Sequence, residues 1–159
     1  MPPEIAAIPA PYTGGCLCGA VRYVLNGEPL TLYACHCTEC QTRTGTAFAL
    51  SLFVSRELFK VEKGEPVLRD VAMADGRRKR GRFCTVCGTR LWGEPLKLPD
   101  AVIVGPGTLD DTSWLRPVAH IWTRSAQPWF RFPQDAILFE TQPPHMELRK
   151  LWRERTPTS

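Results

Sequence analysis

Seven cysteines in three short groups constrain this sequence more than any other feature. Cys16 and Cys18 form a C-x-C pair, the segment 35–40 reads C-x-C-x-x-C, and Cys84 and Cys87 form a C-x-x-C pair. An odd number of cysteines cannot pair completely into disulfides, and clustered thiols in a reducing compartment are typical metal ligands or catalysts. The pattern therefore predicts metal binding.

The two cysteine pairs together supply four thiolates, the number that a structural zinc ion requires. On an extended strand, residues i and i+2 face the same way, so a C-x-C pair can present both thiols to one side. Gly88 follows the C-x-x-C pair, where a left-handed glycine is typical of a zinc knuckle. We expect a structural zinc ion on this four-cysteine group: Cys16, Cys18, Cys84 and Cys87.

Three thiols remain, and we call them the cysteine triplet: Cys35, Cys37 and Cys40. Three protein ligands with an exchangeable fourth position are the arrangement of catalytic zinc. If residues 33–37 form a strand, His36 points away from the neighbouring thiols, which leaves His120, Glu39 or a water molecule as the fourth ligand. The alternatives for the triplet are a metal-free set of reduced thiols or a closed structural site.

The rest of the sequence predicts a mainly β fold with one or two short helices. Segments rich in β-branched and aromatic residues, bounded by turn formers, predict strands within residues 16–25, 46–55, 81–92 and 101–109. Fifteen prolines and twelve glycines fit many tight turns. Short helices are expected over 38–45, capped by Thr38 and ended by Gly45, and near the C-terminus over 145–156.

Length and composition indicate one globular domain with extensions. We expect a flexible arm over 1–11, a zinc-binding domain over 12–132, and an extension with a short helix over 133–159. With 43% hydrophobic and 23% charged residues, the composition is ordinary for a globular protein. The sequence has neither a membrane-spanning run nor a signal-peptide pattern, so we expect a cytoplasmic protein without a membrane partner.

Four motifs, in their order and spacing, resemble the glutathione-dependent formaldehyde-activating enzyme family, which includes centromere protein V. They are GGCLCGAVRY, CHCTECQTRTGTAFA, RFCTVCGTRLW and HIWTRSAQPW, and the similarity runs from about Tyr12 to about Phe132. The resemblance implies a β-tent of small antiparallel sheets. It also implies two zinc ions per chain, one on the four-cysteine group and one on the triplet.

The activity that this resemblance implies is a carbon–sulfur lyase reaction. In the family, glutathione condenses with formaldehyde to S-hydroxymethylglutathione, or the adduct is cleaved. An open zinc site with three thiolates suits this chemistry, because it can bind an incoming thiol and lower its pKa. The expected partner is therefore a small-molecule thiol, with glutathione as the leading candidate.

Residues other than the cysteines are weaker candidates for a functional role. His120 is a candidate proton donor or supporting residue, although a histidine in an apolar segment is more often a core residue. Gln41 and Thr42 follow the triplet directly and are candidates for binding the thiol substrate. The basic run RRKRGR, Arg77–Arg82, is more typical of a solvated hairpin than of a nucleic-acid site.

Two further functions stay open from the sequence. The protein could be a binding module with two structural zinc ions, in which the basic run docks nucleic acid or a protein, although we do not expect nucleic acid as a partner. A thiol-based metal or redox sensor is the weaker alternative.

Overall fold

The computed structural model describes residues 9–155, and its fold is mainly β. The expected arm falls largely on residues 1–8, which lie outside the described residues. The strands are β1 (Tyr12–Gly15), β2 (Arg22–Leu25), β3 (Thr31–Cys35), β4 (Ala49–Ser55), β5 (Phe59–Lys63), β6 (Val67–Ala72), β7 (Arg78–Phe83), β8 (Arg90–Gly93), β9 (Ala101–Val104), β10 (His120–Ile121) and β11 (Leu138–Phe139). The helices are α1 (Thr38–Thr44), α2 (His145–Arg155) and the 3₁₀ turns η1 (Arg56–Leu58), η2 (Pro106–Thr108) and η3 (Thr123–Ser125).

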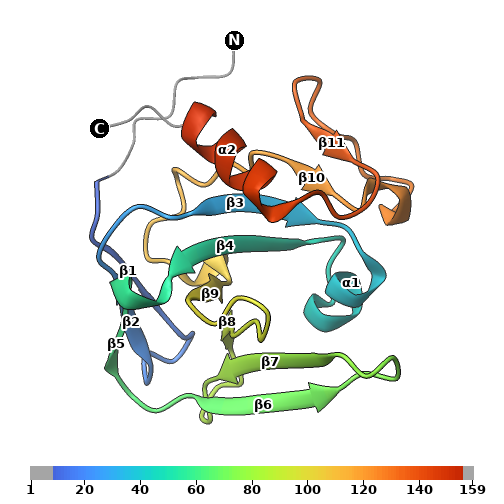
Figure 1. The fold of residues 1–159 in the computed structure, drawn as a ribbon. Coiled ribbons are helices and arrows are strands. Elements are labelled where there is room, and N and C mark those ends of the chain that lie inside the picture. The colour runs from blue at the N-terminus through green and yellow to red at the C-terminus, as the bar shows by residue number, and fades with distance from the viewer. Residues whose placement is uncertain (1–8, 156–159) are drawn as a thin grey trace.

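The strands form two sheets, drawn in Figure 1. A three-stranded antiparallel sheet has the order β1-β2-β5, and an eight-stranded sheet has the order β11-β10-β3-β4-β9-β8-β7-β6. The predicted mainly β class is confirmed. The larger sheet also contains two parallel pairs, β10 with β3 and β10 with β11.

The core lies along β3, β4 and β9 and is closed on one side by α2 (Figure 1). Leu32, Leu52 and Val104 on these strands are almost completely buried. From α2, Leu148 and Trp152 are buried as well, and the Leu148 carbonyl accepts a hydrogen bond of 2.9 Å from the Thr31 hydroxyl. The C-terminal helix is thus packed into the same core as the central strands.

Helix α1 follows β3 directly and has well-defined caps. Gly45 ends the helix in the left-handed conformation, as expected, and its N–H donates to the Gln41 carbonyl. The N-cap, however, is Cys37 rather than Thr38, and its sulfur accepts a hydrogen bond from the Cys40 N–H. Cys37 has the extended backbone of a cap residue, whereas Thr38 is already helical.

The described residues contain no helix with the length and apolar character needed to cross a membrane.

Candidate metal centres

The four-cysteine group comes together at one point although its two pairs are far apart in sequence. Cys18 Sγ lies 3.6 Å from Cys16 Sγ and 3.8 Å from Cys84 Sγ, and all four sulfurs, including that of Cys87, lie within 4.8 Å of one another. Sulfurs on one tetrahedral zinc ion, at about 2.3 Å from the metal, are about 3.8 Å apart, whereas a disulfide needs about 2.05 Å. The group therefore fits a tetrahedral metal ion and not a disulfide.

Local backbone turns, rather than a strand, present the first pair. The strand expected over 16–25 begins only at Arg22, because residues 16–20 form a turn in which the Gly19 N–H donates to the Cys16 carbonyl at 3.1 Å. The Val21 N–H then donates to Cys16 Sγ at 3.2 Å. The two sulfurs lie close together because the turn reverses the chain direction, and not because alternate residues of a strand face the same side.

The second pair sits in a knuckle between β7 and β8. Gly88 has a φ of 75° and donates its N–H to the Cys84 carbonyl at 3.0 Å, so a left-handed glycine closes the turn. The side chain and the backbone N–H of Thr89 donate to Cys87 and lower its pKa to about 5. The knuckle thus favours the thiolate form that a metal ion requires.

The cysteine triplet lies where β3 passes into α1. Cys35 is the last residue of β3, Cys37 is the helix N-cap, and Cys40 lies in the first turn. Their sulfurs lie within 4.8 Å of one another, and within residues 9–155 no histidine, cysteine, aspartate or glutamate joins them as a fourth ligand. Hydrogen bonds from the Cys35 and Cys37 thiols, and then from the Arg43 guanidinium, lower the pKa of Cys40. The triplet can hold a metal ion with three thiolates.

His36 and His120 lie behind the triplet and contact each other. His36 Nε2 is 2.9 Å from His120 Nδ1, and both rings are buried against the side chains of Phe130 and Phe132. His120 pairs with Ala34 across β10 and β3, so it faces away from Cys35. Burial and the neighbouring His120 lower the pKa of His36 to about 4, so the pair is neutral at pH 7.

Glu39 is engaged elsewhere. Its carboxylate forms ion pairs with Arg77 and, at 3.0 Å, with Lys79 on the β6–β7 hairpin. These contacts hold α1 against the hairpin, and Figure 1 shows the two elements side by side. Glu39 therefore serves as a tie between α1 and β7 and is not one of the ligand atoms gathered at the triplet.

The basic run Arg77–Arg82 is compensated by acidic side chains. Its ion pairs are Arg77 with Asp75 and Glu39, Arg78 and Arg80 with Asp70, Lys79 with Glu39, and Arg82 with Glu94. A run whose charges are paired in this way presents little net positive potential. This agrees with the expectation of a solvated hairpin.

Gln41 and Thr42 have different environments. The Gln41 amide donates to the His36 and Ser125 carbonyls at 2.8 and 2.9 Å, and its Oε1 accepts from Gln127 at 3.2 Å. Gln41 therefore ties α1 to the segment after η3. Thr42 is exposed on α1. A substrate contact by either residue stays a prediction.

Two arginines near the triplet were not found from the sequence. Arg43 Nη2 lies 3.6 Å from Cys40 Sγ, and Arg90 lies within electrostatic reach of both Cys40 and Arg43. The spacing of three residues between Cys40 and Arg43 on a predicted helix was an available signal. For Arg90 no local signal exists, because only the tertiary fold brings β8 to this place.

Residues 11–125 match the family of glutathione-dependent formaldehyde-activating enzymes. The chain belongs to this family. All seven cysteines lie within the matched region, whereas α2 lies beyond it. The family match therefore includes both cysteine groups described above.

A solved structure has the same overall fold as this family member. It is the crystal structure of a Rhodobacter sphaeroides protein, which is 19% identical in sequence and superposes with a TM-score of 0.51. The alignment covers 80% of this chain and 98% of that chain. At this identity the likeness concerns the fold alone.

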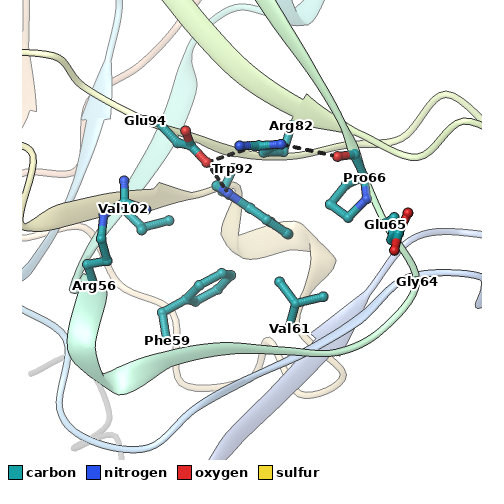
Figure 2. A pocket seen from close by; sticks show the side chains of 10 residues that line it. All are labelled: Arg56, Phe59, Val61, Gly64, Glu65, Pro66, Arg82, Trp92, Glu94 and Val102. Carbon is teal, nitrogen blue, oxygen red and sulfur yellow. Dashed lines mark hydrogen bonds and ion pairs between the residues drawn. The ribbon is translucent and has the colours of Figure 1, made fainter.

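A pocket of about 370 Å³ lies between β5 and the β7–β8 pair, away from both cysteine groups (Figure 2). Arg82 crosses it, donating to Glu94 Oε1 at 2.8 Å and to the Pro66 carbonyl at 3.4 Å. None of its ten lining residues is a cysteine: Arg56, Phe59, Val61, Gly64, Glu65, Pro66, Arg82, Trp92, Glu94 and Val102. The pocket is thus separate from both candidate metal sites.

Proposed function

We propose that the protein is a zinc-dependent carbon–sulfur lyase that acts on the adduct of a thiol with an aldehyde. S-hydroxymethylglutathione, formed from glutathione and formaldehyde, is the leading candidate. The observation that carries the proposal is a three-thiol group without a fourth ligand among residues 9–155, in addition to a complete four-thiol group, in a chain of the formaldehyde-activating enzyme family. We assign a structural metal ion to the four-cysteine group and a catalytic metal ion to the triplet.

The reaction is an addition that balances without an oxidant or a reductant. The thiol sulfur forms a bond to the aldehyde carbon, the carbonyl double bond becomes a single bond, and the thiol proton ends on the oxygen. Cys35, Cys37 and Cys40 would hold a zinc ion, which would offer an open coordination position to the substrate thiol and lower the pKa of that thiol. A zinc ion with three thiolates has a formal charge of about −1, so it suits thiol binding better than carbonyl polarisation.

The surrounding residues hold the triplet in place. Cys37 caps α1 while it accepts the Cys40 N–H at 3.3 Å, so the helix start and the ligand geometry depend on each other. Gln41 fixes α1 through the His36 carbonyl. We assign His120 a positioning role, because its ring contacts His36, which lies between two ligands. Thr42, exposed just beyond the triplet, is our candidate for a substrate contact.

The test is magnetisation-exchange NMR on labelled formaldehyde and glutathione, with and without the zinc-loaded protein. We expect faster exchange between free aldehyde and adduct, and loss of this acceleration in Cys37→Ser. If the protein with full zinc occupancy leaves the exchange rate unchanged, the formaldehyde and glutathione assignment is wrong.

The alternative of a nucleic-acid binding module has less support. It depends on the basic run, and each cation from Arg77 to Arg82 has a carboxylate partner. Binding of nucleic acid would have to break these pairs before the phosphates could replace them.

A further inference from the structure

Arg43 and Arg90 are cations without a carboxylate partner among the described residues. Every arginine and lysine of the run Arg77–Arg82 forms an ion pair, and Arg22 pairs with Asp110, but no ion pair includes Arg43 or Arg90. For Arg90, whose guanidinium is partly removed from water, the lack of a carboxylate is costly, and such a group is expected to meet an anion.

Arg43 borders the triplet from the helix side. It lies one turn after Cys40, on the same face of α1, and its Nη2 approaches Cys40 Sγ to 3.6 Å. Its side chain is exposed to solvent. One edge of the guanidinium therefore meets the thiol while the rest stays available to a ligand that enters from solvent.

Arg90 borders the triplet from the sheet side. Its guanidinium lies over the paired glycines of β7 and β8: a Cβ atom on Gly93 would come within 3.0 Å of Nη2, and one on Gly81 within 3.4 Å of Nε. Burial, and then the charge of Arg43, lower the pKa of Arg90 to about 10, so it is still protonated at pH 7. Two glycines thus leave room for a half-buried cation near Cys40.

The two arginines carry more positive charge than is needed to balance the zinc-loaded triplet. Three thiolates with one zinc ion carry a formal charge of about −1, so one arginine would balance them and the second charge remains. The unbalanced charge lies next to the position where we place the substrate sulfur. A planar guanidinium binds a carboxylate through two parallel hydrogen bonds.

We propose that Arg43 and Arg90 together bind a carboxylate of the substrate, which in glutathione is the glycine carboxylate, and that the enzyme is therefore selective for thiols that carry such a carboxylate. The inference rests on the proposed function, because it needs a thiol at the triplet. It makes the two arginines specificity-determining residues and excludes neutral alkyl thiols as good substrates.

The test compares two thiols that differ only at the carboxylate. Glutathione and its glycine-amide analogue, in which the glycine carboxylate is replaced by a neutral amide, are titrated by calorimetry into the zinc-loaded protein at low ionic strength. We expect glutathione to bind about tenfold more tightly than the amide analogue, as for one charge-assisted hydrogen-bonded pair. Arg43→Gln and Arg90→Gln should each reduce this ratio toward one.

Three controls separate binding from folding. Arg116→Gln removes an exposed positive charge near Val118, which pairs with Leu32 at the opposite end of β3 from the triplet, and should keep the tenfold ratio. Arg90→Lys keeps the positive charge but cannot donate two parallel hydrogen bonds to a carboxylate, so it should give an intermediate affinity ratio. Thermal melting and zinc content identify any variant that has lost its fold.

The outcomes distinguish this inference from the function on which it rests. Equal affinity of the wild type for both thiols, or an equal weakening of both thiols in the arginine variants, would mean that the arginines only balance the thiolates, and the carboxylate site would be wrong. Thiol binding at the triplet would then still stand. If neither thiol binds to fully zinc-loaded protein, the proposed open position fails and the carboxylate site fails with it.

Discussion

His36 Nε2 lies 2.9 Å from His120 Nδ1, and this contact joins the residue after β3, within the segment of the cysteine triplet, to β10. His36 Nδ1 is buried and has no hydrogen-bond partner. A buried N–H without an acceptor is rarer than a lone pair without a donor. We therefore assign the proton of His36 to Nε2, which donates to His120 Nδ1.

Replacing His120 by alanine should reduce the free energy of unfolding by about 2–4 kcal/mol, because it leaves a buried donor without a partner and opens a cavity. His120→Asn should recover part of this loss, since its amide oxygen lies near the position of Nδ1. Denaturant unfolding of the zinc-loaded proteins measures both values. Zinc content should stay unchanged, and loss of one metal ion in His120→Ala would instead make His120 part of the centre.

The two cysteine groups should respond differently to single substitutions. Cys87→Ser should unfold the chain, because it breaks the group that joins the start of the chain to the β7–β8 knuckle. Cys37→Ser should keep the fold and lose one metal ion and the activity. Serine is the better comparison than alanine because Cys37 caps α1, and loss of a cap alone costs about 1 kcal/mol.

Metal analysis and circular dichroism of the two variants provide the readout. Equal collapse of both proteins would argue that the triplet is a second structural site and would remove the main support for catalysis there.

Glu39→Gln should lower stability in a salt-dependent way, because it removes the ion pairs with Arg77 and Lys79. These side chains are partly exposed, so the expected loss at low salt is no more than about 1 kcal/mol. In 1 M salt the variant and the wild type should melt at nearly the same temperature. Glu62→Gln, at an exposed position of β5, serves as the matched control. A loss that salt does not reduce would contradict the electrostatic explanation.

Asp110 should contribute stability that depends on pH. Hydrogen bonds from Arg22 and Thr13 lower the pKa of Asp110 below its ordinary value, so the folded state binds the Asp110 proton more weakly than the unfolded state. The contribution is therefore present above the unfolded pKa of about 3.9 and is lost as pH falls through the folded value.

The comparison of wild type with Asp110→Asn between pH 7 and pH 3 isolates this contribution. We expect a difference below about 1 kcal/mol at pH 7, since both partners are partly exposed. The two unfolding curves should approach each other in acid. Curves that stay parallel would show that the ion pair does not carry the pH dependence.

The division of seven cysteines into four and three could be predicted from the sequence because it depends on counting ligands for a tetrahedral ion. The end of α1 was also predictable, since Gly45 marks it, whereas the N-cap is Cys37 and not the expected Thr38. The strand assumed for Cys16 and Cys18 was wrong although the conclusion drawn from it agrees with the geometry: a tight turn can bring two sulfurs together as well as a strand can.

What the sequence did not reveal depends on contacts between distant segments. His36 and His120 are 84 residues apart, and no local pattern predicts that their rings meet. The acidic partners of the basic run could not be predicted either, because Glu39 comes close to Arg77 only in the folded chain. Arg90 gains its position only when β8 pairs with β7 and the paired glycines leave space above the sheet.

The four-cysteine group also has a consequence for how the chain is made. It joins residues 16–18 to residues 84–87, whereas the triplet is complete within six residues of sequence. A ribosome releases Cys16, Cys18 and the whole triplet before Cys84 and Cys87 exist. If both groups hold metal ions, as we propose, a metal ion bound during that interval has only these five thiols available, and the four-cysteine site is completed later, when the knuckle emerges.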